Sequence, residues 1–144
     1  MSATIGPARP EEFSKVLVLL EQNHLPSDGL ADHRDTLLVA RDGEAVVGSA
    51  ALEVYGDAAL LRSVAVDERW RGQGLGQRLT DAALEMARMR RIHEVYLLTE
   101  TATDFFPRFG FRRVARTDVA AGVQQSIEFT SACPVSALVM AQEV

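Results

Sequence analysis

Residues 69–79, RWRGQGLGQRL, place three glycines at alternating positions between basic side chains. Glycine has no Cβ atom and reaches backbone conformations that other residues avoid, so it allows a ligand to approach the main chain closely. A β-rich run over Ala59–Val66 leads into these glycines, and a helical apolar pattern begins at about residue 74. A turn between a strand and a helix presents backbone N–H groups and the positive end of the helix dipole, which together bind a phosphate. The alternative is a glycine turn required only for close packing of the strand on the helix.

Two common phosphate-binding motifs are excluded by the residues around the glycines. A P-loop ends in Gly-Lys-Ser/Thr, whereas Gly76 is followed by Gln77 and Arg78. A dinucleotide-binding fingerprint spaces its glycines as G-x-G-x-x-G within a parallel βαβ unit. Here the spacing is G-x-G-x-G, and the run before the turn reads as the last of three antiparallel strands. The glycines therefore need another explanation.

The stretch from Arg71 to Gly76, RGQGLG, matches the pattern R/Q-x-x-G-x-G/A and resembles the acetyl-coenzyme A signature of the GNAT superfamily of N-acetyltransferases. The preceding LLRSVAVDERWRG resembles the fourth strand of that family with its exit loop, and the FGF of 109–111 resembles the turn after its fourth helix. The resemblance covers nearly the whole chain and implies one N-acetyltransferase domain over residues 1–144. It implies an α/β fold with a mixed, mostly antiparallel sheet, splayed fourth and fifth strands, and about four helices.

The same resemblance implies acetyl-CoA as the cofactor and indicates which residues would contact it. The pyrophosphate would lie against backbone N–H groups of the glycine loop at hydrogen-bond distance, where added side chains would obstruct it. The pantetheine arm would lie between the splayed strands, and the thioester would lie near the end of the fifth strand. The implied contacts are Val64, Ala65 and Val66 in the fourth strand, Arg71, Gly72, Gln73, Gly74, Leu75, Gly76 and Gln77 in the loop, and Thr99 and Phe106 near the thioester.

Acetyl transfer to an amine requires a base for the amine proton, polarisation of the thioester carbonyl, and stabilisation of the leaving thiolate. Many relatives carry a tyrosine general acid at the position of Phe106, but a phenyl ring donates no proton. Either the thiolate takes its proton from water or another group, or the catalyst is weak or altered. For the base we expect Glu53, where relatives often carry a glutamate that acts through water, with a surface carboxylate as the alternative. Glu100, at the end of the fifth strand, is the second candidate.

Three further residues are expected on the acceptor side of the site. Arg62 and Ser63 lie in mid-strand just before the cofactor contacts. An arginine buried in a sheet requires an anion, which is either an internal carboxylate such as Glu53 or a carboxylate of the substrate. Cys133 precedes the last strand, near the acceptor pocket of the family fold, and the alternative for it is a buried thiol without a role in binding.

Three segments, EVYGDAALLRSVAV, LLTETATDFF and SACPVSALVM, resemble a GNAT subgroup associated with arsenic resistance. This resemblance implies that the acceptor is the α-amino group of a phosphinate- or arsinate-bearing amino acid. Trivalent arsenic prefers several thiolates and the chain has one cysteine, so an arsenical would be bound as an oxyanion, with Arg62 as its partner. The expected function is direct N-acetylation of a small-molecule primary amine in a ternary complex. The alternative, which Phe106 favours, is a non-catalytic acyl-CoA-binding sensor or scaffold of the same fold.

The composition limits the other classes of function. The chain has 144 residues and a net charge of −5, and this acidic balance does not favour nucleic-acid binding. We expect no membrane partner because no apolar run approaches the roughly 18 residues of a membrane span. The single cysteine excludes an intrachain disulfide and a cysteine-rich zinc site, and we expect no metal. Without an apolar signal core at the N-terminus we expect a cytoplasmic protein, for which the family resemblance also allows a homodimer.

The elements that must position these residues can be predicted from apolar spacing and turn residues. Pro10 starts a helix whose apolar stripe ends before Pro26, and Asp42-Gly43 joins two strands in a hairpin. Gly48 indicates a bulge in the second of these strands. The expected strands are about 36–41, 44–55, 59–66, 94–99, 111–114 and 135–140, and the later helices are about 74–91, 102–109 and 118–127.

Overall fold

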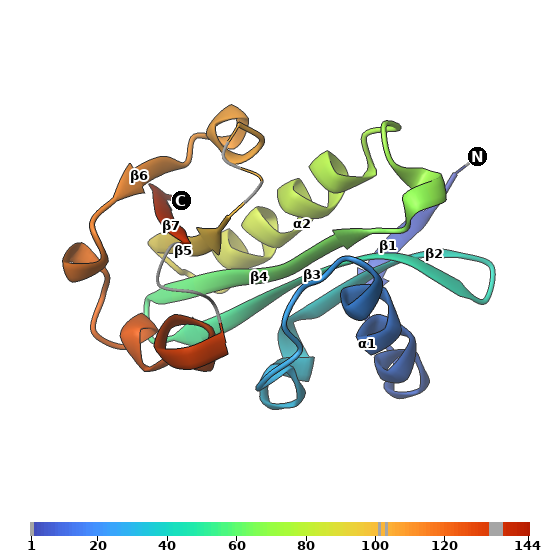
Figure 1. Cartoon of the computed structure of the whole chain (residues 1–144), viewed down its shortest axis with the longest axis horizontal. Coiled ribbons are helices and arrows are strands. Elements are labelled where there is room, and N and C mark those ends of the chain that lie inside the picture. Colours follow the sequence, from blue (N-terminus) through green and yellow to red (C-terminus); the bar gives the residue numbers. More distant parts are fainter. Residues whose placement is uncertain (1, 101, 103, 133–136) are drawn as a thin grey trace.

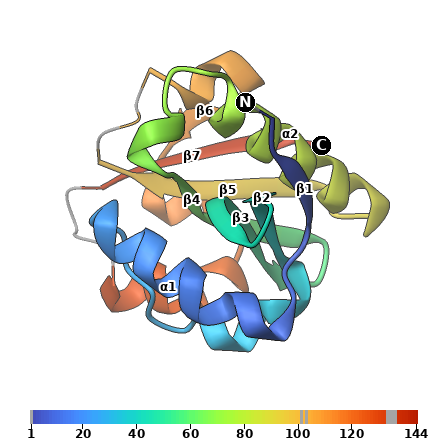
Figure 2. The same cartoon turned by 90° about the vertical axis from the view of Figure 1, so that its right-hand side faces the viewer.

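The structure is a computed structural model, and it describes residues 2–100, 102, 104–132 and 137–144. Within these residues, seven strands form one sheet in the order β1-β2-β3-β4-β5-β7-β6. The helix α1 covers one face of the sheet and α2 covers the other (Figures 1 and 2). The pairing of β4 with β5 is parallel, and the other described pairs are antiparallel. The expected α/β fold with a mixed, mostly antiparallel sheet is confirmed.

The strands are β1 (Thr4–Pro7), β2 (Leu37–Asp42), β3 (Ala45–Tyr55), β4 (Ala58–Val66), β5 (Glu94–Thr99), β6 (Arg112–Val114) and β7 (Leu138–Glu143). The two α-helices are α1 (Phe13–Gln22) and α2 (Leu75–Met89). Short 3₁₀ turns span Pro10–Glu12, Leu30–Thr36, Glu68–Trp70, Phe106–Phe109, Arg116–Asp118 and Val123–Gln125, and a π-helical turn spans Glu128–Ala132. In the described part of the chain, no helix is long and apolar enough to cross a membrane.

The structure departs from the predicted secondary structure in several segments, and of the helix predicted over 102–109 it describes only the 3₁₀ turn Phe106–Phe109. The edge strand β1 was not predicted, since it has only four residues and contains Gly6 and Pro7, which are unfavourable in strand interiors. The helix predicted over 118–127 is wrong, because the segment forms separate 3₁₀ turns. In this segment Gly122 lies close against β3, and a Cβ atom there would lie 2.9 Å from the Cβ of Tyr55.

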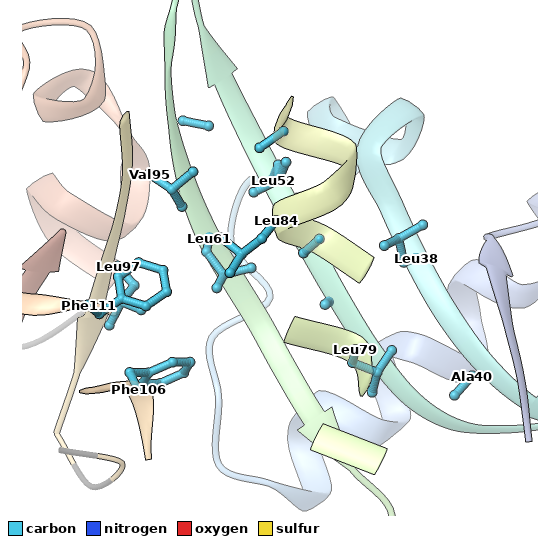
Figure 3. Close-up of a cluster of buried hydrophobic side chains, with 14 of the residues drawn as sticks. Leu38, Ala40, Leu52, Leu61, Leu79, Leu84, Val95, Leu97, Phe106 and Phe111 are labelled. Atoms are coloured by element: carbon cyan, nitrogen blue, oxygen red, sulfur yellow. The ribbon is translucent and has the colours of Figure 1, made fainter. Parts of the chain in front are cut away.

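The α2 face of the sheet holds the largest apolar cluster. Leu79 and Leu84 of α2 pack among side chains of the central strands, including Leu52 and Leu61 (Figure 3). Alternate residues of a strand point to opposite faces, so Leu60 and Arg62 of β4 point away from α2. Substitution of a fully buried leucine such as Leu79 by alanine typically costs about 2–5 kcal/mol, and this packing therefore fixes the position of α2 against β4.

The opposite face carries two smaller apolar clusters with a polar group between them. One lies under α1 and includes Leu19, Leu20 and Val39. The other lies under the turns that follow β6, which appear in orange and red in Figure 1. Glu53 and Arg62 belong to this face, and both are buried. The buried pair of Glu53 and Arg62 therefore lies on the same face of the sheet as these two apolar clusters.

Candidate active site

A cavity of about 940 Å³ opens where β4 and β5 separate. The two strands pair from Ala58 opposite Glu94 to Leu61 opposite Leu97, and the ladder ends there. Beyond that point β5 continues to pair with β7 as far as Thr99, so the edge that faced β4 borders the cavity. The expected splay of the fourth and fifth strands is confirmed, and the cavity has the size of a typical ligand site, about 300–1,000 Å³.

A β-bulge in β4 marks the point of separation. The register between β3 and β4 shifts between Ser49 and Ala51, which leaves one extra residue in β4 at Ser63 and Val64. Ser63 has a φ of 60°, a left-handed conformation that costs a residue with a side chain about 1–2 kcal/mol. The Ser49 hydroxyl donates to the Ser63 carbonyl oxygen at 2.7 Å and holds the bulge in place. Ser63, Val64 and Val66 then line the cavity, whereas the Ala65 side chain packs in the cluster under α1.

The glycine loop precedes α2 and borders the cavity through Arg71 and Gly76. Gly72 and Gly74 have φ values of 78° and 81°, and Gly74 is the N-cap of the helix. The first α-helical bond runs from Arg78 N to Gly74 O at 3.1 Å. Backbone N–H groups of the first turn therefore have no partner within the helix, and the helix dipole adds positive potential there. These amides are those of residues 75–77, the positions at which a pyrophosphate is expected.

The three glycines meet different requirements. At Gly72 and Gly74 the positive φ favours glycine, although an added Cβ atom would meet no atom closer than 3.8 Å. Gly76 has an ordinary helical backbone and lines the cavity. A Cβ atom at Gly76 would lie 3.6 Å from Phe105 and 3.7 Å from Val66, in ordinary contact. A side chain at position 76 would therefore extend into the cavity, whereas a side chain at position 72 or 74 would strain the backbone.

The two arginines beside the loop have different surroundings. Arg71 is exposed, lines the cavity, and donates to Asn23 Oδ1 at 2.9 Å. Arg78 donates to the carbonyl oxygen of Ala3 at 3.0 Å and so ties α2 to the start of the chain. Gln73 and Gln77 are exposed, and the Leu75 side chain is buried in the core below the loop. Among the loop residues, Arg71 is the cation that borders the cavity.

The cavity is also lined by the residues expected near the thioester. Thr99 is the last residue of β5, and its hydroxyl accepts from the Ala102 backbone N–H at 3.0 Å. Glu100 is exposed on the cavity wall. Phe106 lines the cavity and is also packed into the core, with its ring centroid 5.9 Å from that of Phe111 (Figure 3). The position where relatives carry a tyrosine is thus occupied by a largely buried phenyl ring.

Arg62 lines the cavity and joins four segments of the chain. Its Nη1 donates to Glu53 Oε2 at 2.8 Å, and its Nε lies 3.0 Å from Glu128 Oε2. Nη1 and Nη2 also donate to the carbonyl oxygens of Asp28 and Pro26, at 2.7 and 3.1 Å. The Arg62 side chain is fully buried. The expected ion pair with Glu53 is confirmed, and Glu128 is a second partner that the sequence did not indicate.

Glu53 is fully buried and held by hydrogen bonds. Burial raises the pKa of Glu53, but hydrogen bonds from Ser126, Tyr55 and Arg62 outweigh it and hold the pKa below its usual value. Burial and the hydrogen bond to Glu53 raise the pKa of Tyr55 to about 12. The His33 Nε2 atom lies 3.8 Å from Glu53. Glu53 is not among the described residues that line the cavity, so its expected role as a base remains a prediction.

Glu128 and Ser126 lie in a segment whose structure the sequence did not predict. Glu128 begins the π-helical turn, is 4% exposed, and lines the cavity. A signal was present: a glutamate between Ile127 and Phe129 reads as a charge among apolar residues, and such a charge needs a buried partner. Cys133, the other residue expected on the acceptor side, lies outside the described residues.

Comparison with known proteins identifies the fold family. A model of the acetyltransferase (GNAT) domain matches residues 33–113, which is more than half of the chain. An amino-acid acetyltransferase of Mycobacterium tuberculosis is 40% identical over 79 residues, which cover 54% of this chain and 45% of that protein. The chain therefore spans less than half the length of this relative.

Solved structures extend the likeness to the whole fold. Rv2747 from Mycobacterium tuberculosis, in complex with CoA and NLQ, superposes with a TM-score of 0.84 and 26% identity over 98% of this chain and 99% of that one. N-acetylglutamate synthase from Neisseria gonorrhoeae, complexed with coenzyme A and N-acetyl-glutamate, gives a TM-score of 0.83 over 99% of this chain and 35% of that one. Its identity of 16% shows likeness of fold alone. With the splayed strands and the glycine loop, these matches establish that the chain belongs to the GNAT acetyltransferase domain family.

Proposed function

We propose that the chain transfers an acetyl group from acetyl-CoA to a primary amine of a small molecule, by direct attack in a ternary complex. One observation carries the proposal: a single cavity is lined by Arg71 and Gly76 of the glycine loop and by Thr99, Glu100 and Glu128. The helix start that would bind the phosphates and the candidate carboxylates therefore border the same cavity. Such an arrangement would bring the anionic cofactor and the amine acceptor together in one site.

In this proposal each part of acetyl-CoA has its own contacts along the cavity. The first-turn amides of α2 would hold the pyrophosphate, and the backbone of β4 at Val64–Val66 would pair with the pantetheine arm. The amine nitrogen forms a bond to the thioester carbon while the carbon–sulfur bond breaks. The amine proton goes to a base, and the thiolate takes a proton from water, since Phe106 has none to give.

The base in this proposal is a carboxylate. Glu100 lines the cavity and can meet the amine directly. Glu53 lies behind Arg62 and would need an intervening water. Arg62 is already in contact with two carboxylates, which leaves it little positive charge for a substrate anion. The proposed role of Arg62 is therefore to fix the segments of the chain that it contacts, and not to bind the acceptor.

An amino acid is the acceptor that the relatives favour. The Mycobacterium tuberculosis relative at 40% identity is an amino-acid acetyltransferase. We place amino acids and their analogues first among the acceptors. Phosphinate- and arsinate-bearing amino acids are included, on the sequence resemblance to the arsenic-resistance subgroup.

Thiol release from acetyl-CoA tests the proposal. The purified chain is incubated with acetyl-CoA and one of a panel of amines: the standard amino acids, phosphinate- and arsinate-bearing amino acids, and polyamines without a carboxylate. Acetylated product identified by mass spectrometry, at a rate well above the enzyme-free control, supports the transferase. Tight CoA binding by calorimetry without turnover of any amine would contradict it.

That second outcome would favour a non-catalytic acyl-CoA sensor or scaffold. The observation behind this alternative is Phe106, a largely buried ring at the position of the general-acid tyrosine. A homodimer through the last strands also remains a proposal, and β6 is the edge strand on that side of the sheet. Sedimentation at several protein concentrations, with and without CoA, tests the dimer.

A further inference from the structure

We infer that the Ser63 hydroxyl donates a hydrogen bond to the thioester carbonyl oxygen of acetyl-CoA and stabilises the negative charge that forms there. This inference rests on the proposed acetyltransferase function and names a residue that acts on the acetyl group itself. It begins from the position of Ser63, which lines the cavity and yet is only 6% exposed. A hydroxyl in such a place is largely shielded from water, so its hydrogen bond to a charged oxygen is stronger than in solvent.

The strand pairing places Ser63 beside the residues expected to meet the thioester. The ladder between β4 and β5 ends with Leu61 opposite Leu97. The same register continued by two residues would place Ser63 opposite Thr99, but the strands separate there and both residues line the cavity. Thr99 is expected near the thioester, and Val64, which follows Ser63, is expected against the pantetheine arm. Ser63 therefore lies where the acetyl end of the cofactor is expected.

The backbone of Ser63 has a strained conformation at the β-bulge. Its φ of 60° costs a residue with a side chain about 1–2 kcal/mol, whereas glycine adopts this conformation readily. The Ser49 hydroxyl donates to the Ser63 carbonyl oxygen at 2.7 Å and stabilises the bulge. β-Bulges are frequent next to active sites, where they redirect a side chain. A serine at a position that favours glycine points to a function for its hydroxyl.

Arg62 polarises the Ser63 hydroxyl. The Arg62 Nε–H group donates to Ser63 Oγ at 3.2 Å and is shared with Glu128 Oε2, which lies 3.0 Å away. A serine oxygen that accepts a hydrogen bond keeps its own O–H as a donor, and no described residue accepts from this one. A bond from a cationic group makes the hydroxyl a stronger donor in turn, because successive hydrogen bonds polarise one another. Arg62 can therefore act on the cavity through Ser63, although its guanidinium group is paired with carboxylates.

The proposed step leaves Ser63 covalently unchanged. The amine nitrogen forms a bond to the carbonyl carbon, and an electron pair of the C=O bond moves onto the oxygen that Ser63 contacts. This pair returns as the carbon–sulfur bond breaks, and the electrons of that bond leave on the sulfur. Ser63 keeps its proton throughout, and the thiolate takes its proton from water. A donor that acts mainly on the charge formed during the reaction raises kcat more than it tightens binding.

Ser63→Ala and Ser63→Gly test the inference as a matched pair. Both variants lack the hydroxyl, but alanine keeps the Cβ atom and the backbone strain, whereas glycine relieves the strain. We expect both to lower kcat with the amine identified in the panel by about 10²- to 10³-fold, the usual effect of losing one donor to an oxyanion. Acetyl-CoA affinity by calorimetry should stay within about twofold, or about 0.4 kcal/mol. Ser14→Ala, at an exposed serine of α1, is the control and should keep wild-type kcat.

The infrared band of the thioester carbonyl gives a measurement that needs no turnover. Acetyl-CoA with ¹³C at this carbonyl is bound without an acceptor, and the difference from the ¹²C spectrum isolates the band from those of the protein. A hydrogen bond to the carbonyl oxygen lowers the stretching frequency, so the wild-type band should lie below that of free acetyl-CoA. The band should move back toward the free value in both Ser63 variants. A band that stays at its wild-type position in both would overturn the inference.

The kinetic results separate the hydroxyl from the backbone. If Ser63→Ala does not fold, Ser63→Gly carries the test, because glycine accepts a φ of 60°. Wild-type kcat in a folded variant overturns the inference and leaves the acetyltransferase proposal intact. A low kcat in Ser63→Ala that Ser63→Gly restores would assign the effect to backbone strain, which also overturns it. If the wild type acetylates no amine in the panel, the acetyltransferase proposal fails, and the catalytic role of Ser63 fails with it.

Discussion

Glu53 and Arg62 form a fully buried ion pair of 2.8 Å across the neighbouring strands β3 and β4. The pair lies just before the point where β4 bulges away from its regular register. Through Arg62 it also reaches the loop at Pro26–Asp28 and the turn that starts at Glu128. Four segments of the chain therefore meet at one guanidinium group.

Substitution of Arg62 by methionine should strongly destabilise the fold. The variant leaves Glu53 and Glu128 buried without their shared cation, and breaking a buried pair typically costs about 3–5 kcal/mol. Urea unfolding measures this loss. The matched control is Arg69→Met, which removes an exposed pair with Asp67 and should cost about 1 kcal/mol or less. Equal effects of the two substitutions would contradict a structural role for Arg62.

A second ion pair predicts how stability depends on pH. Arg41 donates to both oxygens of Glu12 at 2.9 and 2.6 Å, and chiefly this contact lowers the pKa of Glu12 from 4.5 to about 2. A lowered folded-state pKa stabilises the protein above the unfolded pKa, and the stabilisation is lost as pH falls. The free-energy difference between wild type and Arg41→Gln should be constant above about pH 5 and should shrink toward pH 2. Glu11→Gln, an exposed neighbour, is the control, and a difference that does not change with pH would contradict the prediction.

The features that the sequence predicted have local causes. The need for glycine at positions 72 and 74 is a matter of backbone conformation, and both have positive φ in the structure. The hairpin at Asp42-Gly43 is confirmed, and the bulge expected near Gly48 appears as a register shift between Ala40 and Arg41 in the pairing of β2 with β3. Alternation and turn residues are thus sufficient for the central strands.

The features that could not be predicted from the sequence depend on contacts between distant segments of the chain. Val119 and Val123 have helical spacing, but Gly122 lies against Tyr55, and no local pattern reports that contact. The contact between Glu128 and Arg62 likewise requires the 128–132 turn to fold back over β4. The surroundings of Arg62 are built mainly from such contacts, whereas the glycine loop is one contiguous segment. This difference explains why the sequence was informative for the glycine loop and not for the partners of Arg62.

Phe106→Tyr tests whether the missing general acid limits turnover. Phe106 lines the cavity, and the substitution adds a hydroxyl to a ring whose packing against Phe105 and Phe111 is otherwise unchanged. We expect kcat to rise, by at most the roughly 10²-fold that marks the lower end of acid catalysis, while CoA affinity is unchanged. Thiol release under saturating substrates measures kcat. An unchanged kcat would mean that thiolate departure does not limit the reaction, and lost CoA affinity would mean that the hydroxyl is not tolerated in the packing.

Position 76 offers the sharpest test of the pyrophosphate site. Gly74→Val is a poor test because a φ of 81° strains any side chain, but Gly76 has a helical backbone and lines the cavity. Gly76→Val should weaken CoA binding at least tenfold, or about 1.4 kcal/mol, because its branched methyl groups extend into the space needed by the phosphates. Gly76→Ala should bind CoA almost as wild type and gain up to about 1 kcal/mol of helix stability, since its Cβ meets Phe105 at an ordinary 3.6 Å. Calorimetry and thermal unfolding of both variants give the two quantities. Equal CoA affinity of folded Gly76→Val and wild type would remove the pyrophosphate from this helix start.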